Sequence, residues 1–166
     1  GKVSVMATRD LDLQFKTYFI ANRKLVDSGS LSPMQDLAPL QAKARELTFT
    51  FGSKDSTSGH MMPRFFMTEA GIDPDKDFKN TGYQAVGGHS ATLAAVESGA
   101  TDVGALSFLV WDNASAAVKQ GAPIIYTTKA YVDYAWCVHS RIGHDLMTRL
   151  TDTLIGLDRN NADDKA

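Results

Sequence analysis

Hydrophobic residues recur at two spacings that alternate along the chain. Short runs rich in β-branched and aromatic residues predict strands, and runs with apolar residues every three or four positions predict helices. The predicted strands are 2–6, 15–21, 47–51, 78–86, 102–106, 123–127 and 134–139, and the predicted helices are 34–44, 58–70, 90–98, 107–119 and 143–157. This alternation predicts an α/β fold with a mainly parallel sheet flanked by helices, in one domain over residues 1–157. Residues 158–166 are predicted to form a polar tail.

The junction between a strand and a helix at residues 49–60 differs from an ordinary turn. The strand ends at Gly52, and Ser56, Thr57 and Ser58 then come in a row where the helix begins. A single hydroxyl is enough for a helix N-cap, which is the alternative interpretation. Three hydroxyls at a point where free N–H groups and the positive end of the helix dipole face outward favour an anion-binding site.

A second strand-to-helix junction carries the sequence Gly87-Gly88-His89. Ligands of parallel sheets bind beyond the carboxyl ends of the strands, so both junctions are predicted to lie at the same edge of the sheet. There, His89 would donate a hydrogen bond to an anion held by the hydroxyl-rich turn. The alternative is a histidine that only caps its helix.

The stretch Tyr131-Val-Asp-Tyr-Ala-Trp136 places aromatic residues around one acid. Such a cluster can line a cleft, with Asp133 pairing with a cation or fixing a loop. Alternatively, aromatic residues at strand spacing belong to the core. The neighbouring Cys137 lies in the same predicted strand, and we expect it to be a buried structural thiol.

Composition excludes several classes of protein. The chain has 166 residues, 43% of them hydrophobic, and a net charge of -2, which suits a globular domain and argues against a nucleic-acid-binding protein. With one cysteine there is no internal disulfide. No apolar run approaches a membrane span, the four histidines lack metal-ligand spacing, and the turn at 52–59 lacks the ending of a Walker loop. No nucleophile–base pair is evident, so we expect neither catalysis nor a cofactor.

Several motifs together resemble those of the phosphonate/phosphite-type substrate-binding proteins of bacterial ABC transporters. They are Ser56–Gly59 followed by Pro63-Arg64, Ala70–Pro74, Gly88-His89, Thr101–Ala105 and Tyr131–Trp136. The resemblance implies a type II periplasmic-binding-protein fold, in which two α/β lobes close on a ligand about a hinge. Members of this family are much longer, and the chain resembles mainly the second lobe, with the opening half of the first lobe absent.

The resemblance also implies roles for individual residues. Ser56–Ser58 would grip the oxyanion, and His89 would contact it as well. In aminoalkylphosphonate binders two acids hold the substrate amine; one of these positions falls on Asp133, and the other falls near Leu109, where this chain has no acid. Phosphite, a simple alkylphosphonate or another tetrahedral oxyanion therefore remain candidates. A tyrosine of the family falls near Tyr18.

The sequence therefore predicts the solute-binding component of an ABC importer, which captures a tetrahedral oxyanion without breaking a bond. The expected partners are the small ligand and the transporter permease, through which the protein is peripheral to the membrane. The expected location is periplasmic, or at the cell surface as a lipoprotein, with a signal peptide outside this sequence. The alternatives are a ligand-sensing domain fused to a signalling protein and, lacking a metal carboxylate pair and a base, a small phosphate-handling enzyme.

Overall fold

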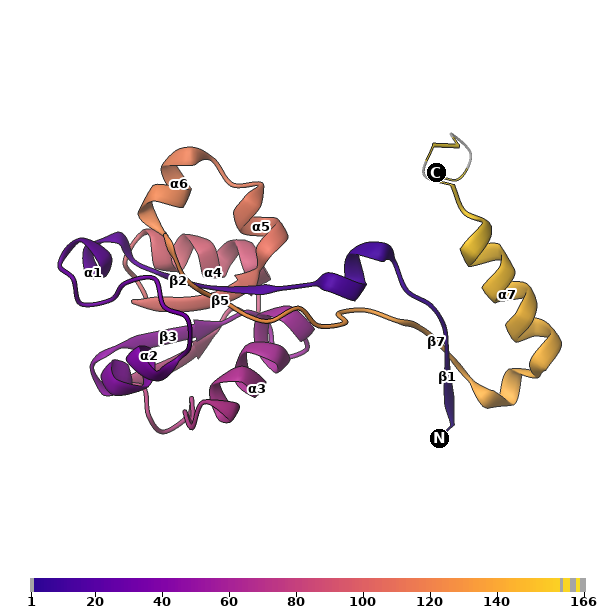
Figure 1. Cartoon of the computed structure of the whole chain (residues 1–166), viewed down its shortest axis with the longest axis horizontal. Coiled ribbons are helices and arrows are strands. Elements are labelled where there is room, and N and C mark those ends of the chain that lie inside the picture. Colours follow the sequence, from indigo (N-terminus) through magenta and orange to yellow (C-terminus); the bar gives the residue numbers. More distant parts are fainter. Residues whose placement is uncertain (1, 159, 162–163, 165–166) are drawn as a thin grey trace. The chain divides into compact units, whose positions relative to one another are not determined.

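The computed structural model describes residues 2–158, 160–161 and 164, and these divide into two compact units (Figure 1). One unit joins the two ends of the chain, up to residue 14 and from residue 131 onward, and the other is the continuous segment 15–130. The assignment of residues 1–157 to a single lobe stays a prediction. The predicted polar tail at 158–166 falls partly outside the described residues.

A five-stranded sheet organises the segment 15–130. Its strand order is β4-β3-β5-β2-β6, with β2 at Thr17–Ala21, β3 at Thr48–Phe51, β4 at Asn80–Tyr83, β5 at Val103–Ser107 and β6 at Ile124–Thr127. Strand β3 pairs in parallel with β4 and β5, whereas β2 runs antiparallel to both β5 and β6. Four of the five strands therefore share one direction, and the predicted α/β fold with a mainly parallel sheet is confirmed.

Helices cover both faces of this sheet (Figure 1). They are α1 (Arg23–Asp27), α2 (Ala38–Lys43), α3 (Met62–Glu69), α4 (Gly88–Glu97), α5 (Phe108–Asp112) and α6 (Ala116–Gly121), with a 3-10 turn at Ala44–Glu46 and a π turn at Thr57–Met61. Side chains of α2 and α3 pack with Phe19, Phe49 and Phe51 in the larger core cluster. Side chains of α4, α5 and α6 pack with Ile20 and Leu106 in the smaller one. Successive residues of β2 point to opposite faces of the sheet, so this strand contributes side chains to both core clusters.

Three local predictions were wrong in extent. The helix predicted at 107–119 is two helices, because Ser115 starts α6 by accepting the N–H of Val118 on its hydroxyl at 3.4 Å. The helix predicted at 34–44 begins only at Ala38, whose N–H is taken by the Asp36 carboxylate at 2.9 Å. The strand predicted at 78–86 is confined to β4, and α1, which Asn22 caps, was not predicted.

The unit formed by the two chain ends contains a two-stranded antiparallel ribbon of β1 (Val3–Ala7) and β7 (Trp136–His139). It also holds 3-10 turns at Asp10–Gln14 and Ser140–Ile142 and the helix α7 (His144–Gly156). No helix among the described residues has the length and apolar character needed to cross a bilayer.

The solvent exposure of side chains in this unit tests the predictions for Cys137 and for the aromatic residues beside it. Cys137 is exposed, so the predicted buried thiol is wrong. In the part of the chain that the structure describes, β7 pairs with β1 alone, and this ribbon leaves Cys137 open to solvent. Tyr134 and Trp136 are 53% and 54% exposed, so these two aromatic residues are not core residues.

We expect the core of the segment 15–130 to depend strongly on Phe49, which is 1% exposed. Its ring centroid lies 4.8 Å from that of Phe51 and 5.0 Å from that of Phe78. Phe49→Ala should lower the free energy of unfolding by about 3–5 kcal/mol, measured by chemical denaturation, because it removes buried area and leaves a cavity. Val86→Ala, at a position that is 89% exposed, is the control and should change it by less than about 0.5 kcal/mol. Equal effects of the two substitutions would contradict this assignment of the core.

Candidate functional site

The hydroxyl-rich turn follows β3 directly and opens the helical segment that continues into α3. Ser56 is the N-cap, and its Oγ accepts the N–H of Gly59 at 3.0 Å. The Ser56 carbonyl accepts N–H groups from both His60, at 3.1 Å, and Met61, at 3.0 Å. The second of these bonds spans five residues and defines the π turn, a feature that often marks functional sites. By the geometry of any helix, the N–H groups of Thr57 and Ser58 have no carbonyl one turn earlier to accept them.

Thr17, in β2, links the turn to the sheet by a hydrogen bond. The Thr17 hydroxyl donates to the carbonyl of Ser58 at 2.8 Å, and Thr17 itself donates its N–H to the hydroxyl of Thr128 at 3.0 Å. All three residues are buried, with Ser58 only 2% exposed. The start of the helix is therefore held in place by hydrogen bonds that solvent does not weaken.

His89 reaches the same turn from the start of α4. Its Nε2 lies 3.5 Å from the Oγ of Ser56 and 3.4 Å from the Oγ of Ser58. A Cβ on Gly59 would lie 2.8 Å from Cε1 of His89, so the absence of a side chain at Gly59 allows the ring to approach. The prediction that the two glycine-bearing junctions meet at one edge of the sheet is confirmed.

The backbone fixes both the position and the protonation of His89. Gly87 and Gly88 have φ angles of +82° and +49°, and this left-handed turn places His89 in the first turn of α4. The N–H of Ser107, at the end of β5, donates to Nδ1 of His89 at 3.2 Å. Because a backbone N–H can only donate, we assign the ring proton to Nε2, which faces the two serines.

Burial also lowers the pKa of His89, which favours the neutral ring. The interpretation of His89 as a helix cap is wrong, because Gly87 is the N-cap of α4 and the ring bonds to β5 instead. Hydroxyls, N–H groups at a helix start and one neutral imidazole N–H therefore converge. Such a set of donors binds an anion without a cationic side chain.

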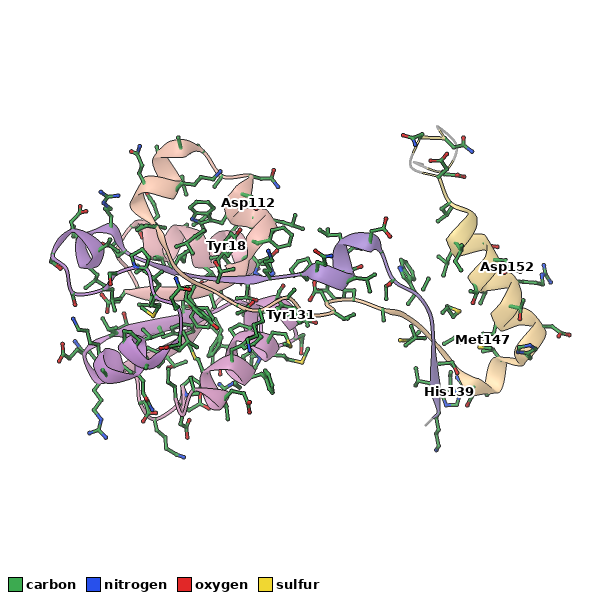
Figure 2. All side chains as sticks on the ribbon, in the orientation of Figure 1. Tyr18, Asp112, Tyr131, His139, Met147 and Asp152 are labelled. Carbon is green, nitrogen blue, oxygen red and sulfur yellow. The ribbon has the colours of Figure 1, made fainter. Side chains whose placement is uncertain are left out.

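Tyr18 lies in β2 next to Thr17, and adjacent residues of a strand point to opposite faces of the sheet. Its ring packs edge-on against Trp111 and Phe108 of α5, with centroids 5.8 and 6.3 Å apart. Tyr18 is hydrogen-bonded to Asp112 at the end of α5, and both residues are labelled in Figure 2. Burial raises the pKa of the Tyr18 hydroxyl, and the charge of Asp112 and this hydrogen bond raise it further. A ligand-binding role for Tyr18 stays a prediction.

Asp133 lies in the unit formed by the chain ends. Its N–H donates to the carbonyl of Asp12 at 3.0 Å, and the Asp12 carboxylate forms two hydrogen bonds of 2.7 Å with the guanidinium of Arg9. Both carboxylate oxygens of Asp133 are buried and have no hydrogen-bond partner among the described residues. Burial, and then the negative charge of Asp12, raise the pKa of Asp133 to about 6, against the opposing effect of Arg9. Its predicted contact with a ligand stays a prediction.

Two residues that position the site were missed in the sequence. Thr17 is a buried polar residue at an inward position of a strand, and that pattern is a signal that sequence inspection can use. Ser107 contributes its backbone N–H to His89, and every residue except proline carries that group. Its role therefore becomes visible only once β5 and α4 are placed together.

Comparison with known proteins identifies relatives over almost the whole chain. The family described as "ABC transporter, phosphonate, periplasmic substrate-binding protein" matches residues 2–166. The probable ABC transporter phosphite binding protein PhnD1 of Prochlorococcus marinus (strain MIT 9301) is 37% identical over 161 residues, which make up 93% of this chain and 52% of PhnD1. The chain therefore spans about half the length of this curated relative.

Solved structures show the same similarity. The structure of PhnD1 from Prochlorococcus marinus in complex with methylphosphonate superposes with a TM-score of 0.78 at 33% identity, covering 99% of this chain and 61% of that one. A binding protein component of an ABC phosphonate transporter from Pseudomonas aeruginosa gives a TM-score of 0.68 at 20% identity, covering 98% of this chain and 51% of that one. The second likeness supports the fold alone.

We expect Asp133 to make stability depend on pH. Its pKa is about 6 in the folded chain and about 4 when unfolded, so the stability gained from its protonation is lost as the pH rises through 6. Asp133→Asn should remove the cost of the ionised carboxylate, which solvent screening reduces to about 1 kcal/mol at this partly exposed residue. The melting temperature should rise by about 2–4 °C at pH 7.5 and stay unchanged at pH 4.

Asp10→Asn, at an exposed acid of the same unit, is the matched control and should leave both melting temperatures unchanged. An equal shift for Asp133→Asn at the two pH values would show that ionisation of Asp133 is not the cause.

Proposed function

Because this chain belongs to the family of periplasmic substrate-binding proteins of phosphonate ABC transporters, we propose that it captures a tetrahedral phosphorus oxyanion for import. The observation that carries this proposal is the approach of His89 Nε2 to the hydroxyls of Ser56 and Ser58 at the start of a helix. The candidate ligands are phosphite and simple alkylphosphonates.

The donors of the site account for an anion ligand in a chain whose net charge is -2. A hydrogen bond to an ionised acceptor is roughly twice as strong as one between neutral groups, so hydroxyls, N–H groups and a neutral imidazole suffice. Several donors directed at one point also fit the oxygens of a tetrahedral group. A site without salt bridges favours release, because no opposite charge has to be separated when the ligand leaves.

The hydrogen-bonding needs of the site itself support an incoming acceptor. The Oγ of Ser56 accepts from Gly59 N–H, and Nε2–H of His89 lies at the long distances of 3.5 and 3.4 Å from the two serine hydroxyls. Contacts of this length are weak and tighten easily onto a stronger acceptor. An anion between them would accept hydrogen bonds from the Nε2–H of His89 and from the serine hydroxyls at the same time.

The absence of an acid near Leu109 favours phosphite or an alkylphosphonate over an aminoalkylphosphonate as the ligand. Leu109 lies in α5, where the acid of that helix, Asp112, is hydrogen-bonded to Tyr18. The two-acid clamp that the resemblance implies for a substrate amine would then lack one of its acids, with Asp133 as the other. Binding, closure of the two lobes and release make up the mechanism, and no bond is broken.

The matched family and its relatives also bear on partners and location. They are components of ABC transporters, which implies a small ligand and a permease partner, and a periplasmic or cell-surface site of action. We propose that this protein delivers its ligand to such a permease, being peripheral to the membrane or anchored as a lipoprotein. These relatives favour an importer over a ligand sensor fused to a signalling protein.

Calorimetric titration of the full-length protein tests the proposal with phosphite, methylphosphonate, aminoethylphosphonate, phosphate and sulfate. We expect phosphite or methylphosphonate to bind more tightly than sulfate. Thr57→Val, which keeps the shape of the side chain, and His89→Ala should each weaken that binding about tenfold to a hundredfold, since each removes a hydrogen bond to a charged group.

Ser98→Ala is the control, because the Ser98 hydroxyl bonds within α4 at the opposite end from His89. This variant should bind like the unaltered protein. The proposal is wrong if none of the five anions binds, or if Thr57→Val and His89→Ala both retain full affinity.

A further inference from the structure

A second polar network adjoins the hydroxyl-rich turn and centres on His60. The Nδ1 of His60 lies 2.8 Å from the carbonyl oxygen of Lys54, in the loop that leads to Ser56. On the other side of the ring, Nε of Arg64 donates to Nε2 of His60 at 3.1 Å. One imidazole therefore connects the loop before the anion-binding turn with α3.

Arg64 is itself held firmly. Its guanidinium forms two parallel bonds with the Asp75 carboxylate, at 2.7 and 2.9 Å, and donates to the hydroxyl of Tyr83 at 2.6 Å. A guanidinium bound by a carboxylate through two bonds is fixed in direction as well as position. The far end of the network thus rests on β4 and on the turn after α3.

Aromatic contacts hold the ring of His60 against side chains from two neighbouring strands. Its centroid lies 5.0 Å from that of Phe51 in β3 and 5.3 Å from that of Tyr83 in β4, with both pairs edge-on. Phe51 is fully buried. The imidazole is therefore held in place both by packing against these two rings and by its two hydrogen bonds.

These partners define the protonation of His60. Arginine can only donate, so Nε2 of His60 is the acceptor, and Nδ1 carries the proton that is donated to the carbonyl of Lys54. A single neutral tautomer satisfies both bonds. A second proton, on Nε2, would face the N–H of Arg64 and break that contact.

We propose that His60 is a positioning residue for the oxyanion site, which it serves by holding the carbonyl of Lys54 and so the loop that carries Ser56. This inference rests on the proposed function. Among the described residues, the loop at 53–55 has one other hydrogen bond, from the N–H of Ser56 to the carbonyl of Ser53 at 3.1 Å. Since donors must stand within a fraction of an ångström of their places, a loop that is held before the ligand arrives binds more tightly.

The side chain of Lys54 makes a further contact with β4, since its Nζ lies 4.8 Å from the centroid of the Tyr83 ring. The Asp75 carboxylate is engaged by Arg64, which keeps the guanidinium in place beside His60.

Three substitutions at His60 separate the two bonds. Asparagine places its amide nitrogen near the position of Nδ1 and keeps the bond to Lys54, whereas glutamine reaches the position of Nε2 and keeps the contact with Arg64. Alanine loses both. The dissociation constant for methylphosphonate should rise about tenfold in His60→Ala and in His60→Gln, and less than about threefold in His60→Asn.

Hydrogen exchange in the loop gives a readout that separates the two hydrogen bonds of His60. Hydrogen exchange of the amides at 53–56 without ligand should be faster in His60→Gln than in His60→Asn. His144→Ala, at an exposed histidine of α7, serves as the control.

Equal affinities and equal exchange rates for His60→Asn and His60→Gln would overturn the positioning role of His60. If the unaltered protein binds no phosphorus oxyanion, the proposed function fails, and the inference for the ligand fails with it. If the unaltered protein binds and the two variants behave alike, only the inference for His60 fails.

Discussion

The hydrogen bond from the N–H of Ser107 to Nδ1 of His89 sets the chemistry of the site. It joins the end of a fully buried strand to the first turn of α4. Because Nδ1 accepts this hydrogen bond, the proton of the neutral imidazole lies on Nε2. Without this bond, either nitrogen could carry the proton, and a ring protonated on Nδ1 would present a lone pair to an anion. A contact made by the backbone thus decides whether the site attracts or repels its proposed ligand.

The remaining parts of the site serve the same purpose, which is to gather donors that carry no charge. The buried hydroxyl of Thr17 donates a hydrogen bond to the carbonyl of Ser58. Gly59 has no side chain, which leaves room for the ring of His89. The N–H groups of Thr57 and Ser58, in the first turn of the helix, have no carbonyl one turn earlier to accept them. Burial, which lowers the pKa of His89, keeps the ring neutral and makes the site a set of dipoles in place of a salt bridge.

The sequence was sufficient to predict the parts of this site that are encoded locally. Three consecutive hydroxyls after a strand, and a histidine after two glycines, are visible in a single reading, and the parallel arrangement of the strands places them at one edge. The roles of Thr17 and Ser107 depend on contacts 41 and 18 residues away, which no local pattern contains. The exposure of Cys137 has the same origin, because burial of a strand depends on which other elements cover it. The contacts of Tyr18 and Asp133 with a ligand stay predictions.

Nitrogen NMR of the protein labelled at histidine, recorded with and without methylphosphonate, tests the central claim most directly. We predict that His89 is neutral at pH 7.5 with its proton on Nε2, and that saturating methylphosphonate shifts the Nε2 resonance while Nδ1 remains unprotonated. A His89 ring protonated on Nδ1, or an Nε2 resonance that methylphosphonate leaves unchanged under saturating conditions, would contradict the account of this site.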